Sequence, residues 1–125
     1  MDVATYDDNI KLFDTAYTKH GHVDHAIACA GILEQGKWFD RELTIATVKT
    51  PESNRAIDVN LLGVLYFARI AVVYLKEAKS KEEDKSVTLI SSAAGFRESA
   101  LPVYQVRSTK KKTWHHEIRG DMLIR

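Results

Sequence analysis

The fold is decided by the stretch Ser86-Val87-Thr88-Leu89-Ile90-Ser91, which is followed by Ser92-Ala93-Ala94-Gly95. Its length and β-branched residues predict a buried strand, and the small residues after it predict a break. Residues 51–79 precede it and predict a long helix, because Pro51 suits a first helical turn. Between residues 57 and 75 this helix is apolar on nearly all sides, which predicts burial on several faces.

The same order of helix and strand occurs earlier in the chain. Between about Thr5 and His20, apolar residues recur at spacings of three and four, which predicts an amphipathic helix that stops at Gly21. Residues 22–28 predict a short strand, and residues 32–50 predict a loop. Helix, strand, helix, strand is typical of parallel βαβ units. We therefore expect an α/β fold.

Composition excludes several classes of protein. The chain has 125 residues and a formal net charge of +1, which suits one domain and argues against a dedicated nucleic-acid binder. The single cysteine, Cys29, excludes an internal disulfide framework and indicates a reducing compartment. The apolar run at residues 61–75 is shorter than the ~20 residues that cross a bilayer, and the acidic start does not resemble a signal peptide. We expect a cytoplasmic protein without a membrane partner.

Residues 105–125 differ in kind from the rest of the chain. They hold six basic and two acidic residues, whereas residues 1–104 carry more acidic than basic side chains. We therefore predict one partial domain over residues 1–104 and a divergent basic tail over residues 105–125. The basic run at residues 107–112 with Trp114 suits nucleic acid, but a solvated surface is the favoured interpretation because no aromatic residues are interleaved with it.

Two further motifs have alternative readings. Gly31 to Lys37 has the spacing G-x-x-x-x-G-K of a phosphate-binding loop, but Trp38 follows where a magnesium-binding hydroxyl is needed, and Glu34 brings a carboxylate. A second group of side chains could in principle ligate a metal: His20, His22, His25 and Cys29. Because successive side chains of a strand point to opposite faces, the histidines of the predicted strand would not converge on one ion, and we predict no metal site.

Three polar positions stand out in this apolar setting. Asn60 lies inside the predicted long helix, Ser92 follows the second strand, and Tyr104 comes twelve residues after Ser92. Alone, each has an ordinary explanation as a kink, a turn residue or a core aromatic. A buried asparagine nevertheless costs free energy unless its amide is hydrogen-bonded, and this cost favours a functional role for Asn60. Together with the turn Ala28-Cys29-Ala30-Gly31, these motifs resemble the short-chain dehydrogenase/reductase family across residues 2–106.

The resemblance implies a partial Rossmann-like fold, a doubly wound parallel sheet that lacks the N-terminal nucleotide-binding βαβ unit and the C-terminal strands. It implies hydride transfer between NAD or NADP and a small alcohol or carbonyl substrate. By resemblance, Tyr104 is the general acid/base, Ser92 hydrogen-bonds the substrate oxygen, and Asn60 holds a water in a proton relay. The implied cofactor-binding residues are Asp2 and Val3 at the adenine, and Cys29, Ala30 and Gly31 in the turn.

The chain departs from the family in two places. Ser108 stands four residues after Tyr104, where the family has a lysine that assists the tyrosine, and Lys110 comes two positions too late. No glycine-rich turn of the G-x-x-x-G-x-G or G-x-G-x-x-G type occurs to hold a pyrophosphate. We therefore expect a truncated central segment that is weak or inactive alone, and whether the chain is itself an enzyme stays open. The alternative is a non-catalytic remnant or interaction module from a truncated or mis-spliced gene.

The helix at residues 51–79 has a further implication. Members of the family commonly dimerise through the matching helix, so the resemblance implies a homo-oligomer. An open sheet edge on each predicted strand also favours self-association.

Overall fold

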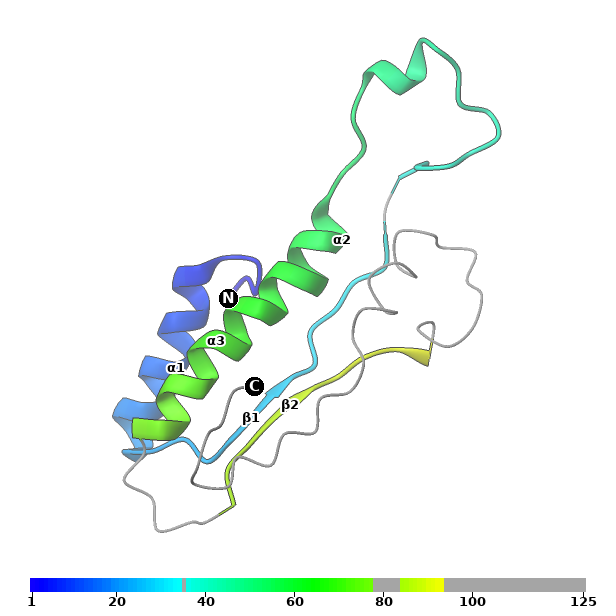
Figure 1. The fold of residues 1–125 in the computed structure, drawn as a ribbon. Coiled ribbons are helices and arrows are strands. Elements are labelled where there is room, and N and C mark those ends of the chain that lie inside the picture. Colours follow the sequence, from blue (N-terminus) through cyan, green and yellow to red (C-terminus); the bar gives the residue numbers. More distant parts are fainter. Residues whose placement is uncertain (35, 78–83, 94–125) are drawn as a thin grey trace.

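The computed structural model describes residues 1–34, 36–77 and 84–93 (Figure 1). The elements follow one another in the predicted order of helix, strand, helix and strand, with a helical turn in the loop between the first strand and the second helix. Their bounds are α1 (Tyr6–His20), β1 (His25–Ala28), η1 (Thr47–Lys49), α2 (Arg55–Ile57), η2 (Asp58–Leu62), α3 (Gly63–Glu77) and β2 (Ser86–Leu89). The α/β class predicted from the sequence is therefore confirmed.

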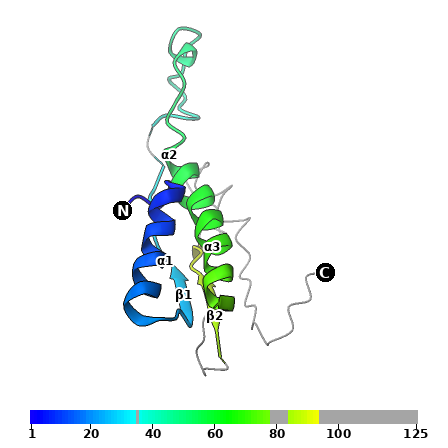
Figure 2. The same ribbon diagram turned by 90° about the vertical axis from the view of Figure 1, so that its left-hand side faces the viewer.

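The two strands form a parallel sheet in which His25 lies opposite Ser86 and Ala28 lies opposite Leu89. The backbone N–H of Ile90 also donates to the carbonyl of Ala28 at 2.9 Å, so pairing continues one residue beyond β2. Helices α1 and α3 pack side by side, and α3 contacts both strands (Figures 1 and 2). The result is one layer of helices against a two-stranded sheet.

A small core joins the helices to the sheet. Phe13 of α1 and Phe67 of α3 stack with ring centroids 5.1 Å apart, and both side chains are buried. Ala26 and Ala28 face this core, whereas Ile27 between them is 59% exposed. Neither strand is therefore fully buried, and the prediction of a buried strand at residues 86–91 is wrong for this part of the chain, because the described helices cover only one face of the sheet.

The long helix is likewise buried on one side. Its buried residues include Val64, Phe67 and Ile70, but Leu65 and Val73 are each 55% exposed. Within this single chain the helix is not buried on several faces, because the only helix packed against α3 in the described residues is α1, and burial against a partner subunit stays a prediction. The continuous helix Arg55–Glu77 contains an 18-residue stretch with a mean hydropathy of 1.8, so by length and composition it could cross a bilayer, and 44% of that stretch is buried inside the protein.

Helix and strand ends differ from the sequence-based bounds for local reasons. The predicted stop of α1 is confirmed, since Gly21 has φ of 79° and its N–H donates to the carbonyl of Tyr17 at 2.7 Å. The second helix begins at Arg55 rather than Pro51, because the side chain of Glu52 bonds to the preceding loop. β1 begins at His25 rather than residue 22, because β2 offers pairing only from Ser86 onward.

Candidate functional site

Asn60 is the most constrained polar side chain of the candidate site. It lies in the π-helical segment η2, its residue is 0% exposed, and both ends of its amide are hydrogen-bonded. Its Oδ1 accepts from the backbone N–H of Ile32 at 2.8 Å, and its Nδ2 donates to the carbonyl of Ile32 at 2.6 Å. The buried amide is therefore satisfied, and it fixes the chain directly after Gly31. π-Helical turns are frequent at functional sites.

A polar hollow lies beyond the carboxyl ends of the two strands. Its volume is about 220 Å³, and it is lined by Cys29, Ala30, Gly31, Ile32, Leu33, Ile90 and Ser91. Ligands of open parallel α/β sheets bind in this position. The structure thus brings all three turn residues predicted to bind the cofactor, Cys29, Ala30 and Gly31, to one hollow with the end of β2.

Ser91, the last residue of the stretch predicted to form the second strand, is a candidate site residue that the sequence analysis does not name. Its Oγ is buried without a hydrogen-bond partner in the described structure, and the residue lines the polar hollow. Such a hydroxyl is expected to bind a water or a ligand. The adjacent pair Ser91-Ser92 was the available signal, but sequence alone does not tell which hydroxyl faces the hollow. Ser92 itself is half-buried.

The predicted adenine-pocket residues lie in the turn before α1. The Asp2 carboxylate accepts from the Arg55 guanidinium at 2.6 Å through Oδ2 and from the N–H of Ala4 at 3.0 Å through Oδ1. The Arg55 hydrogen bond is the main cause that holds the pKa of Asp2 below its ordinary value. Asp2 is therefore ionised at neutral pH and is an acceptor for N–H donors.

Val3 is held from two sides. Its carbonyl accepts from the Asn9 amide at 2.8 Å, and Asn9 is itself 0% exposed. A Cβ added at Gly63 would lie 2.8 Å from the same carbonyl oxygen, so this close approach requires glycine. The turn therefore packs directly on the start of α3.

A second, apolar hollow connects the two groups of predicted cofactor residues. It has a volume of about 160 Å³, and Val3, Cys29, Ala30, Val59 and Gly63 are among its lining residues. Cys29 and Ala30 line both hollows. The structure therefore brings Val3 near the turn that follows β1, although 25 residues separate Val3 from Ala28 in the sequence.

Three predicted features lie outside the described residues: Tyr104, the Ser108 position and the basic tail at residues 105–125. The convergence of Tyr104 with Asn60 and Ser92 therefore stays a prediction, as does the domain boundary after residue 104.

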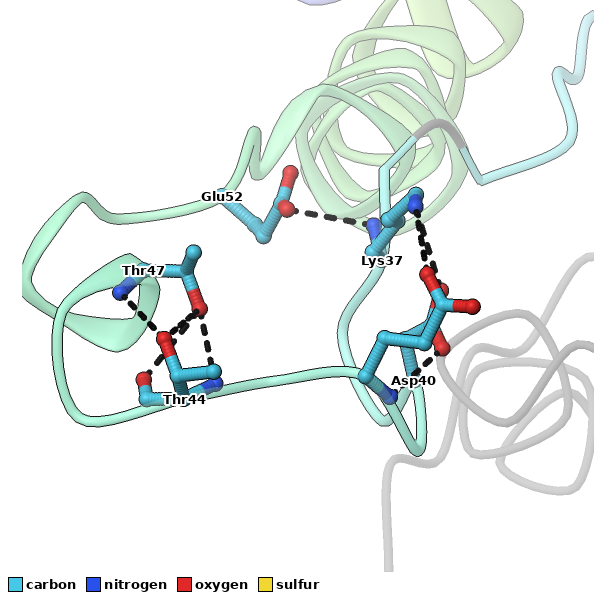
Figure 3. A network of polar contacts seen from close by, with 6 residues as sticks. Lys37, Asp40, Thr44, Thr47 and Glu52 are labelled. Carbon is cyan, nitrogen blue, oxygen red and sulfur yellow. Dashed lines mark hydrogen bonds and ion pairs between the residues drawn. The ribbon is translucent and has the colours of Figure 1, made fainter.

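The loop with phosphate-loop spacing holds a carboxylate instead of an anion site. The N–H of Lys37 donates to Glu52 at 3.1 Å, and a Cβ at Gly36 would lie 2.2 Å from a Glu52 oxygen (Figure 3). The Lys37 ammonium lies 3.5 Å from Asp40 and 3.8 Å from Glu42. The donors that would face a phosphate are thus engaged by acidic side chains.

The histidines near β1 have other partners. His22 lies 3.2 Å from Asp24, and Nδ1 of His25 lies 3.0 Å from the Ser86 hydroxyl. Within the described ranges, no three His, Cys, Asp or Glu side chains are grouped so that they could hold a metal ion.

Comparison with known proteins agrees with this architecture. The crystal structure of a short-chain dehydrogenase/reductase (glucose/ribitol dehydrogenase) from Brucella melitensis superposes with a TM-score of 0.65 at 28% identity, covering 87% of this chain and 41% of that one. A 3-oxoacyl-[acyl-carrier protein] reductase from the same organism, in complex with NAD, shares the fold with a TM-score of 0.68 at 20% identity, over 87% and 42% of the two chains. The fold is therefore that of a partial Rossmann-like α/β protein.

Sequence similarity identifies the family. The family described as short chain dehydrogenase matches residues 1–111. The short-chain dehydrogenase/reductase ascJ of Acremonium egyptiacum is 32% identical over 95 residues, which are 76% of this chain and 32% of that protein. The short-chain dehydrogenase/reductase prx4 of Penicillium roqueforti is 32% identical over 90 residues, or 71% and 26% of the two chains. The chain belongs to the short-chain dehydrogenase/reductase family, and it spans about a third of the length of these relatives.

Proposed function

We propose that this chain supplies the turn and the strand ends that face cofactor and substrate in an NAD(P)-dependent oxidoreductase acting on a small alcohol or carbonyl compound. The observation that carries the proposal is the polar hollow, where Cys29, Ala30 and Gly31 meet the buried Ser91 hydroxyl at the carboxyl ends of two parallel strands. Family membership adds the reaction class.

The residues of the hollow fit a nicotinamide cofactor. The turn after β1 has small side chains at Ala30 and Gly31, so its backbone is open to a bound group. In the proposal, Val3 and the ionised Asp2 lie at the adenine end, where Asp2 accepts from the adenine amino group. The cofactor, NAD or NADP, supplies the hydride chemistry when bound.

The proposed proton chemistry is carried by side chains of the chain. Ser92 hydrogen-bonds the substrate oxygen, and Tyr104 gives or takes the proton. A tyrosine of pKa ~10 is only about one part in a thousand ionised at pH 7, and Ser108 replaces the assisting lysine, so the chain alone is expected to be slow. The two hydrogen bonds to Ile32 give the Asn60 side chain a role in positioning the turn, and the water of the proton relay at Asn60 stays part of the proposal.

A homo-oligomer through the long helix is part of the proposal. Leu62, Leu65 and Val73 lie on one face of the helix and are 38%, 55% and 55% exposed, with the exposed Arg69 between Leu65 and Val73 on the same face. Apolar side chains on one helix face suit a second copy of the same helix. We place the protein in the cytoplasm, in line with its single thiol and near-neutral charge.

Deuteride transfer tests the proposed function. The chain at high concentration is incubated with NADPH or NADH deuterated at the transferable position and a panel of small aldehydes and ketones, and products are examined by mass spectrometry. The proposal expects slow deuterium incorporation that Ser92→Ala and Tyr104→Phe abolish. Incorporation that survives both substitutions contradicts the assigned roles. Complete absence of incorporation favours the alternative, a non-catalytic interaction module.

A further inference from the structure

Arg55 joins two parts of the site that are far apart in the sequence. Its Nη2 donates to Oδ2 of Asp2 at 2.6 Å across 53 residues. The Arg55 side chain is 47% exposed and that of Asp2 is 40% exposed, so the ion pair lies at the protein surface. Arg55 is also the first residue of α2.

Besides this ion pair, the start of the helix is attached by the Ser53 hydroxyl, which accepts from the backbone N–H of Arg55 at 3.2 Å, and by the buried side chain of Ala56. α2 contains three residues before the π-helical segment begins, and its N-cap residue, Asn54, makes no side-chain capping hydrogen bond. The backbone N–H groups of Ile57 and Asp58 donate to the Asn54 carbonyl at 2.8 and 3.1 Å. The first turn of a helix frays readily, and the contact between Arg55 and Asp2 is the one ion pair that holds it among the described residues.

The segment that carries Asn60 is bracketed by two contacts with the same turn. Arg55 contacts Asp2 before η2, and Gly63 lies against the Val3 carbonyl after it. The turn is itself fastened to α1, because Asp8 accepts from the N–H of Asp2 at 2.8 Å and Asn9 donates to Val3.

We propose that Arg55 is a positioning residue: by holding Asp2, it keeps the π-helical segment in the orientation in which the Asn60 amide meets Ile32. The line of contacts runs from Asp2 through Arg55 and Asn60 to Ile32, and each step is a hydrogen bond or a continuous stretch of helix. It couples the proposed adenine end of the site to the turn after β1. The importance of this coupling for cofactor binding rests on the proposed function, but the positioning itself does not.

Amide hydrogen exchange tests the positioning without any cofactor. The exchange rate of the Ile32 N–H is measured by NMR in the full chain and in Arg55→Gln, with Lys49→Gln as an exposed control. We expect Ile32 to exchange about 2- to 5-fold faster in Arg55→Gln, as suits loss of a half-exposed ion pair, and Lys49→Gln to have no effect. Core amides such as that of Ala71 keep their rates.

Two further variants separate positioning from general destabilisation. Arg55→Lys restores slow exchange at Ile32 at least in part, because a cation again faces Asp2. The double variant Asp2→Asn/Arg55→Gln exchanges no faster at Ile32 than the faster single variant, because both changes remove one interaction. Unchanged exchange at Ile32 in Arg55→Gln overturns the proposal, as does an equal acceleration of Ile32 and Ala71. Failure of cofactor binding alone leaves these outcomes unaltered and counts only against the proposed function.

Discussion

Asn60 and Ile32 hold each other by a reciprocal pair of hydrogen bonds, of 2.8 and 2.6 Å, between one side-chain amide and one backbone peptide. The Asn60 amide thereby satisfies both the N–H and the carbonyl of Ile32, as the backbone of a neighbouring strand would in a sheet. The contact connects the middle of a helix to the residue after the Cys29–Gly31 turn, and its burial excludes water from competing.

Replacing Asn60 by alanine is expected to destabilise the fold and to release the loop. The substitution leaves the Ile32 N–H and carbonyl without their partner, which costs about 1–3 kcal/mol for a buried group. Urea unfolding followed by circular dichroism measures this loss. Asn54→Ala is the matched control, because Asn54 is exposed and its side chain caps nothing. Equal stability of the two variants would contradict the role of the Asn60 amide.

Gly63→Ala is expected to displace the turn before α1. The added Cβ would approach the Val3 carbonyl oxygen to 2.8 Å, and the obstacle is backbone rather than a flexible side chain. Overpacking of this kind costs about 1–3 kcal/mol. The control is Lys19→Ala at the exposed end of α1, which is expected to change the melting temperature little. A Gly63→Ala protein as stable as the parent would show that the approach is not tight.

The stability contributed by the Asp2–Arg55 pair is expected to depend on pH. Arg55 lowers the folded-state pKa of Asp2 below the ordinary 3.8, so the contribution is fully present above about pH 4 and is lost as pH falls through the lowered value. The melting temperatures of the parent and of Arg55→Gln therefore differ by a constant amount at neutral pH and converge in acid. A difference that grows on acidification would contradict this assignment.

Self-association is expected through the exposed side of α3. Light scattering after size-exclusion chromatography should show dimers or larger species for the parent chain, and Leu65→Glu/Val73→Glu should shift it toward monomers. Charged residues at these exposed positions cost the folded monomer little, while they oppose burial in an interface. Lys19→Glu at the exposed end of α1 serves as the control. A monomeric parent chain would remove the basis for this prediction.

The parts of the fold that the sequence predicted are those set by local pattern. The periodicity of α1, the glycine that stops it and the parallel pairing of β1 with β2 are confirmed. The start of α2 was missed because it depends on a carboxylate contact from Glu52 to a loop fifteen residues earlier. The burial of the long helix and of the strands was overestimated within the single chain. An apolar segment can be buried only where a neighbouring element covers it, and no described element covers Leu65 or Ile27.

The candidate site was predicted by resemblance more than by pattern. Cys29, Ala30 and Gly31 do line a common hollow, and Asn60 is buried and satisfied. The role of Ile32 as the partner of Asn60 was not predicted, because it is made through the backbone of an apolar residue. The unpaired hydroxyl of Ser91 was not predicted either, because the sequence does not distinguish Ser91 from the adjacent Ser92. The Asp2–Arg55 pair was equally invisible, since 53 residues separate its members.

The measurement that tests the central claim most directly is a titration of the ¹⁵N-labelled chain with NAD⁺ and NADP⁺, followed by NMR. We expect no saturable binding at micromolar concentrations by calorimetry, because no glycine-rich turn is present in these 125 residues, but local NMR shifts at millimolar concentrations. The shifts are predicted at residues 29–32 and at Ser91, with none at Lys19 on the far end of α1. Shifts confined to other surfaces, or micromolar affinity, would contradict the account of this hollow as a partial cofactor site.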